Sequence, residues 1–103
     1  MNRKQIAIDF AKSLNCPEIE KIILFGSVAR GEDNINSDID ILIITKNIND
    51  KIKIEDDIYS KVFNILLKTN EYLSVKMRSI NHYEDHKDFP FYENIENEGI
   101  LIG

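Results

Sequence analysis

The sequence has few of the residues that mark the special classes of protein. Cys16 is the only cysteine among 103 residues, so no internal disulfide can form and nothing indicates an oxidising compartment. No histidine or basic residue adjoins Cys16, so we expect a small packed side chain rather than a reactive thiol. No apolar run approaches the length of a membrane span or a signal-peptide core. We therefore expect a cytoplasmic protein without a membrane partner.

The composition is that of a packed globular protein. Hydrophobic residues make up 43% of the chain and charged residues 30%, while four glycines and two prolines are too few for a disordered or fibrous chain. The length is close to the commonest size of one domain, so we expect a single domain over residues 1–103. A net charge of −5 argues against a broadly basic surface, so extended nucleic acid is not an expected partner.

The hydrophobic pattern alternates between helical and strand periods. Ile6, Phe10 and Leu14 recur at helical spacing, whereas Leu73 to Arg78 alternates apolar and polar residues. The predicted elements are a helix over 6–14, a strand over 20–25, a one-turn helix with Ser27 near its N-cap and Gly31 at its end, a strand from Asp38, a loop over 47–50, a helix ending near Asn70, a strand over 72–80, and helices over 82–87 and 91–98, the last with Gly99 as a left-handed C-cap. This order predicts an α/β (α+β) fold, a small mixed β-sheet with helices packed on at least one face.

The first segment that carries chemistry runs from Leu24 to Gly31. Gly26 lets a bulky anion approach the backbone, and Ser27 offers a hydroxyl. The start of the following short helix presents unpaired N–H groups and a partial positive charge. We interpret Gly26 and Ser27 as a phosphate-binding turn, although a Gly-Ser pair alone is more often an ordinary turn.

The second segment is the strand that contains Asp38 and Asp40. Two residues apart on a strand, both carboxylates project to one face, where they repel each other unless a cation lies between them. Mg²⁺ is typically bound by one or two carboxylates together with phosphate oxygens. An Asp-x-Asp pair alone is more often a solvated edge, but beside a phosphate-binding turn it indicates phosphoryl or nucleotidyl transfer.

Over Leu24 to Ile43 the chain resembles the DNA polymerase beta-like nucleotidyltransferase superfamily, and it is most similar to the minimal nucleotidyltransferase group. The resemblance implies that Gly26 and Ser27 hold a nucleoside triphosphate and that Asp38 and Asp40 are the catalytic, Mg²⁺-binding pair. It also implies that Arg30 lies close to the phosphates. The alternative for Arg30 is a surface ion pair with Glu32 or Asp33.

The chain departs from this family at Lys76. Active members place a third carboxylate on the strand after the long helix, where it completes the metal site and helps to deprotonate the attacking hydroxyl. Lys76 stands at that position, with Ser74 and Arg78 on the same face. A lysine ammonium can bind a phosphate oxygen but cannot accept a proton, so we expect nucleotide binding with weakened catalysis. The acids that could take the place of the missing carboxylate are Glu71, Glu32 and Asp33. The sequence does not indicate that any of them does so.

The resemblance implies a Mg²⁺-dependent enzyme that transfers a nucleoside monophosphate, AMP from ATP, to a hydroxyl of a protein. It also implies a small helical HEPN-type partner, with this chain as the antitoxin of a toxin–antitoxin pair. The alternative is a catalytically degenerate nucleotide-binding protein that acts by docking on a helical partner.

The end of the chain carries two weaker signals. His82 and His86 have the spacing of metal ligands on a helix, but a third ligand is not apparent, so we expect surface histidines. Phe89, Phe91 and Tyr92 surround Pro90, and we expect them to pack the terminal helices onto the sheet rather than to form a contact patch.

Overall fold

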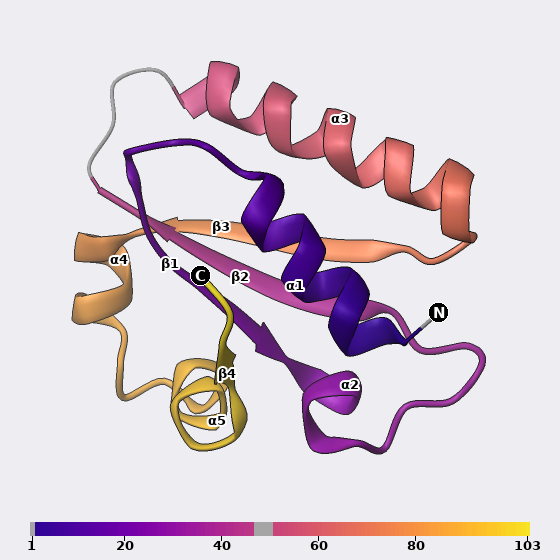
Figure 1. Ribbon diagram of the computed structural model, residues 1–103. Helices are drawn as coiled ribbons and strands as arrows, with labels where there is room; N and C mark the ends of the chain where they lie inside the picture. The colour runs from indigo at the N-terminus through magenta and orange to yellow at the C-terminus, as the bar shows by residue number, and fades with distance from the viewer. Residues whose placement is uncertain (1, 47–50) are drawn as a thin grey trace.

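The computed structural model describes residues 2–46 and 51–103. In chain order its elements are α1 (Arg3–Ser13), β1 (Ile19–Phe25), α2 (Gly26–Arg30), β2 (Ile39–Thr45), α3 (Lys51–Thr69), β3 (Leu73–Ser79), α4 (Ile80–Asp85), α5 (Pro90–Glu98) and β4 (Ile100–Leu101) (Figure 1). The predicted loop over 47–50 lies outside the described residues.

The four strands form one mixed sheet in the order β3-β2-β1-β4. β1 pairs antiparallel with β2 and with β4, while β2 and β3 are parallel. Because β3 returns parallel to β2, the connection between them has to cross back along the sheet, and α3 makes this crossover. Figure 1 shows that α2 and α4 consequently lie at opposite ends of the strands.

Helices cover both faces of the sheet. On one face α1 and α3 pack on the odd-numbered side chains of β2 and β3, in a core that includes Phe10, Ile41, Ile58 and Leu73. On the other face α4 and α5 cover Leu42 and Ile44 with Tyr83, Tyr92 and Ile95. The Tyr83 hydroxyl donates to the Glu96 carboxylate and so joins α4 to α5. The predicted α/β class with a small mixed sheet is confirmed.

Most element boundaries follow local signals. The Asn2 side chain accepts from the Gln5 N–H and caps α1, and Pro90 occupies the first turn of α5, where its missing N–H costs nothing. Gly31 ends α2 in the left-handed conformation, with φ of 72°, as predicted. Among the described residues, no helix is long and apolar enough to cross a membrane.

Four boundary predictions are corrected. α4 spans Ile80–Asp85 rather than 82–87, because the Ser79 side chain accepts from the His82 N–H and caps the helix. α2 begins at Gly26, so Ser27 is its second residue and Phe25 is the N-cap. β2 begins at Ile39, one residue after Asp38. Gly99 has φ of −69° and ψ of 149°, which is extended rather than left-handed backbone. Gly99 is extended because the chain continues directly into β4, which pairs with Ile23 and Leu24 of β1.

Candidate active site

Gly26 lies at the junction of β1 and α2, directly against Asp40. Its φ is +75°, and a Cβ built on it would lie 2.3 Å from the Asp40 Oδ2 atom. Phe25 pairs with Asp40 across the antiparallel ladder, so the register of β1 and β2 fixes this approach. Only glycine accommodates both the positive φ and the adjacent carboxylate. The Gly-Ser turn and the aspartate pair, which the sequence joins only through a loop, are therefore in contact.

The two aspartates differ in their surroundings. Asp38 is exposed just before β2, whereas Asp40 is half-buried within the strand. Burial raises the pKa of the Asp40 carboxyl, and the negative charge of Asp38 raises it further. The two carboxylates are thus close enough to repel each other. A divalent cation between them, with phosphate oxygens as further ligands, would relieve this repulsion, so the pair fits Mg²⁺.

Two cations lie within electrostatic reach of this pair. The charges of Lys76 and Arg30 each lower the pKa of Asp40 and so partly offset its burial. Lys76 is exposed on β3 and pairs with Leu42, two residues beyond Asp40 on the same face of the sheet. Lys76 is therefore on the same face of the sheet as Asp40 and within electrostatic reach of it.

Arg30 makes the ion pairs of a surface residue as well. Its Nη1 atom lies 3.1 Å from Glu98 of α5, and its Nε atom lies 3.6 Å from Glu32. The predicted alternative, an ion pair with Glu32, is thus present together with a Glu98 contact that the sequence did not indicate. Because Arg30 also acts on Asp40, the two interpretations of this residue are compatible.

A cavity of about 220 Å³ opens beside the Gly-Ser turn. Phe25, Gly26 and Arg30 line one side, and Phe91, Asn94, Ile95 and Glu98 of α5 line the other. The rings of Phe25 and Phe91 meet edge to face, with centroids 5.6 Å apart. Phe91 therefore contacts the sheet through Phe25 and borders the candidate site. The packing prediction for the aromatic residues around Pro90 holds for the buried Tyr92 but is wrong for Phe89, which is 57% exposed, while Phe91 is 39% exposed.

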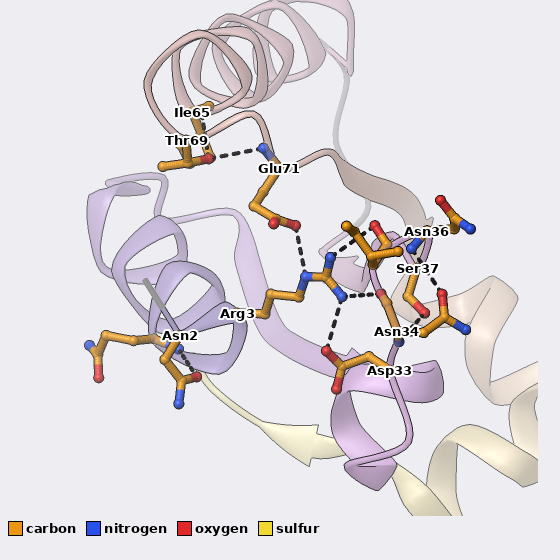
Figure 2. A network of polar contacts seen from close by, with 11 residues as sticks. Asn2, Arg3, Asp33, Asn34, Asn36, Ser37, Ile65, Thr69 and Glu71 are labelled. Carbon is orange, nitrogen blue, oxygen red and sulfur yellow. Dashed lines mark hydrogen bonds and ion pairs between the residues drawn. The ribbon is translucent and has the colours of Figure 1, made fainter.

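Arg3 holds the loop that leads to Asp38 (Figure 2). Its guanidinium pairs with Asp33 at 3.0 Å and with Glu71 at 2.8 Å, and it also donates to the main-chain carbonyls of Asn34 and Ile35. The side chain of Arg3 is only 14% exposed. A single residue of α1 thus joins the α2–β2 loop to the turn before β3, which the sequence gave no reason to expect.

The acids that could have replaced the third carboxylate are instead engaged in ion pairs with arginines. Asp33 and Glu71 face Arg3, and Glu32 faces Arg30. Across residues 2–46 and 51–103, no group of three or more His, Cys, Asp and Glu side chains could hold a metal ion.

Comparison with known proteins identifies the class. Residues 6–103 match the family described as polymerase beta, nucleotidyltransferase, so the chain belongs to this family of enzymes. It is also 32% identical, over 105 residues and 99% of each chain, to the Methanocaldococcus jannaschii protein named "Putative protein adenylyltransferase MJ0604".

Solved structures with the same fold come from toxin–antitoxin complexes. One, titled as a toxin-antitoxin with AMP-PNP, matches 100% of this chain and 73% of that chain, with a TM-score of 0.60 and 20% identity. Another contains a tri-AMPylated Shewanella oneidensis HEPN toxin in complex with an MNT antitoxin; it matches 99% of this chain and 69% of that chain, with a TM-score of 0.52 and 18% identity. These likenesses confirm the fold.

Proposed function

We propose that this protein transfers AMP from ATP to a hydroxyl group of a protein partner, with Mg²⁺ bound by Asp38 and Asp40. The observation that carries the proposal is the contact between Gly26 and Asp40, which joins a phosphate-binding turn to a half-buried carboxylate. In a nucleotidyl transfer the reacting phosphate and the metal must be adjacent. The contact between Gly26 and Asp40 supports the proposal that Gly26, Ser27 and the aspartate pair act as one site.

The acceptor and the partner follow from the relatives. The M. jannaschii relative is named as a protein adenylyltransferase, and the Shewanella complex contains an AMPylated toxin. We infer that a small helical HEPN-type protein is both partner and acceptor, and that this chain acts as the antitoxin in the cytoplasm. The outer side of α3 supports a partner, because it carries an exposed apolar row that the fold leaves uncovered: Ile52, Tyr59, Phe63 and Leu67.

Each residue of the site has a distinct part in this reaction. Gly26 and Ser27 hold the triphosphate. Gly26 leaves open the space beside Asp40 that a Cβ would fill, and the first N–H groups of α2, which have no partners within the helix, can donate to phosphate oxygens. Asp38 and Asp40 hold the metal, which when bound neutralises charge on the phosphates. Arg30 and Lys76 add positive charge at the edge of the site. No carboxylate among these residues stands where the resemblance places the acid that accepts the proton of the acceptor hydroxyl.

Lys76 favours a second candidate function. A protein with this nucleotide site but without a third carboxylate can bind ATP and act by docking on its partner without turnover. The charge of Lys76 lowers the pKa of Asp40, and this cation stands where the resemblance places the base. The two candidates share nucleotide binding and differ in whether AMP is transferred.

The first test is metal-dependent ATP binding measured by calorimetry. We expect binding in Mg²⁺ that is lost in EDTA and in the double variant Asp38→Ala with Asp40→Ala. Asp9→Ala on α1 is the matched control, because Asp9 is an exposed aspartate on a helix that covers the opposite face of the sheet. Binding that persists in EDTA or in the double variant would show that the aspartates do not hold the metal.

A further inference from the structure

A second, larger cavity lies at the other end of the sheet from the Gly-Ser turn. Its volume is about 750 Å³, and it opens between the end of β3 and α4. Its lining includes the cations Lys51 and Arg78 and the imidazoles of His82 and His86, with Tyr92 of α5 beside His82. No acidic residue lines this cavity in the described part of the chain. In a protein with a net charge of −5, such a lining is a marked segregation of charge.

Arg78 is the centre of this cationic cavity. It is half-buried at the end of β3, and its Nη1 atom donates to the Met77 carbonyl at 2.8 Å. Within residues 2–46 and 51–103, no carboxylate lies within 4.0 Å of its guanidinium. Arginine presents several donors in a fixed fork that matches carboxylate or phosphate oxygens. A half-buried guanidinium that borders a cavity and has no acidic partner is a ready anion-binding group.

The α4 side of the cavity is held in place by ring contacts. The rings of His82 and His86 stack with centroids 4.2 Å apart, and His86 Nδ1 donates to the His82 carbonyl at 2.7 Å. Tyr92 of α5 meets His82 edge to face. These contacts fix the imidazoles against α5, so this wall of the cavity is already formed without a ligand.

A row of polar side chains connects the cavity to the catalytic end. Ser74, Lys76 and Arg78 alternate along β3 and pair with Asp40, Leu42 and Ile44, so they share the face of the sheet that carries Asp40. Arg78 is four residues from Ser74, which corresponds to roughly 13 Å along an extended strand. Lys76 stands between the two sites. An extended ligand could therefore contact the aspartates at one end and Arg78 at the other.

We propose that this cavity is a subsite for the acceptor, and that it binds acidic side chains of a protein segment about four residues from the hydroxyl that receives AMP. The inference rests on the proposed function, because it assigns the substrate class of the same site. An acidic peptide fits better than a second nucleotide, since the row along β3 is continuous and matches the repeat of an extended chain. Carboxylates of the acceptor would pair with Arg78, which has no acidic partner among the described residues.

The experiment uses two fluorescein-labelled decapeptides and fluorescence anisotropy. Each peptide has one central tyrosine; one has glutamates four residues away on both sides, and the other has glutamines there. We expect the glutamate peptide to bind about tenfold more tightly, because charge-assisted hydrogen bonds to arginine are the stronger class. The preference should disappear in Arg78→Gln and weaken in Lys51→Gln, an exposed position that leaves the strand intact.

Lys12→Gln serves as the matched control, because Lys12 is an exposed cation on α1, which packs on the opposite face of the sheet. It should leave the preference unchanged. In a ¹H–¹⁵N spectrum of the wild type, the glutamate peptide should shift the amides of residues 78–86, whereas Mg²⁺-ATP should shift those of Gly26 and Asp40. Equal affinity for the two peptides, or a preference that survives Arg78→Gln, would overturn the proposal.

Two further results would separate this inference from the proposed function. If ADP shifts residues 78–86 and its effect is lost in Arg78→Gln while neither peptide binds, the cavity is a nucleotide site and the acceptor proposal is wrong. If Mg²⁺-ATP fails to shift Gly26 and Asp40, the proposed function fails. Arg78-dependent binding of the glutamate peptide would then still support an anion-binding cavity for an acidic protein segment.

Discussion

Gly26 and Asp40 approach so closely that the absence of a side chain at residue 26 is part of the site. The Gly26 Cα faces the Asp40 carboxylate, and a Cβ would stand 2.3 Å from Oδ2. Gly31 has nearly the same backbone, with φ of +72°, but no heavy atom lies within 4 Å of a Cβ built there. Gly26 and Gly31 thus share the left-handed backbone conformation but differ in their neighbours.

This pair allows a matched test. We expect Gly26→Ala and Gly31→Ala each to lower the free energy of unfolding by about 1–2 kcal/mol, the usual cost of a non-glycine residue in left-handed backbone. Only Gly26→Ala should also abolish Mg²⁺-dependent ATP binding, because the new methyl group displaces Asp40. Urea unfolding and calorimetry measure the two effects. Loss of binding in both variants would mean that backbone strain alone disrupts the site.

The raised pKa of Asp40 predicts a conflict between stability and function. Burial and Asp38 make the charged form of Asp40 unfavourable in the folded protein. An acid with a raised folded pKa destabilises the protein above that pKa, and the effect fades as the pH falls to the ordinary aspartate range. In EDTA at pH 7, Asp40→Asn should therefore raise the Tm, and the difference from wild type should shrink in acid.

Thermal unfolding across pH 3 to 8 measures this dependence. Asp88→Asn is the control, because Asp88 is an exposed acid between α4 and α5. It should leave the Tm and its pH dependence close to those of wild type. An Asp40→Asn variant that is less stable than wild type at pH 7 would contradict the inference that the carboxylate is held at a cost to the fold.

At the scale of elements, prediction from sequence succeeded where an element buries one face. α1 and β3 were predicted because their apolar residues repeat with the helical or strand period, and the same residues fill the core. β4 was missed because its two residues have no period, and only their pairing with β1 defines the strand. The Gly99 prediction was wrong for the same reason, since a glycine after a helix does not reveal that a strand follows.

The connection between elements made by Arg3 is also invisible in sequence, because Glu71 is 68 residues away. We expect Arg3→Gln to release the α2–β2 loop, since three segments meet on this guanidinium. Hydrogen exchange of residues 32–37 should become faster, and Mg²⁺-ATP affinity should fall several-fold as Asp38 loses its fixed approach. Lys4→Gln, at the exposed neighbouring position, should change neither quantity.

At the scale of the whole molecule, the sequence predicted only those residues of the candidate site that lie close together along the chain. Gly26, Ser27, Asp38 and Asp40 lie within a short segment whose chemistry can be recognised without a fold. The contribution of Glu98 to Arg30, and the cavity around Arg78, depend on how α5 and α4 pack on the sheet. The alternation of side chains on β3 predicted that Arg78 and Lys76 share a face of the sheet. Arg78 lines a cavity only because α4 packs beside the end of β3, which the sequence did not predict.

Lys76 decides between the two candidate functions of the molecule. Its charge lowers the pKa of Asp40, and it stands on β3 where the resemblance would place an acid. We expect the wild type to bind Mg²⁺-ATP but to transfer AMP slowly. Lys76→Asp should raise the rate by up to roughly 10²–10⁴-fold, the usual worth of a general base, provided that the rest of the site is intact. Intact mass spectrometry of the co-purified partner measures the AMP added.

Lys76→Gln is the control that separates the two effects of this substitution, because it removes the cation without supplying a base. Rates are compared at equal nucleotide occupancy, since a third carboxylate would add to the repulsion at Asp40 and alter the Mg²⁺ requirement. If Lys76→Gln accelerates transfer as much as Lys76→Asp, the lysine inhibits by its charge and no base is needed. If the wild type transfers AMP rapidly and both variants are inactive, Lys76 holds a phosphate in a working enzyme and the missing-base argument is wrong.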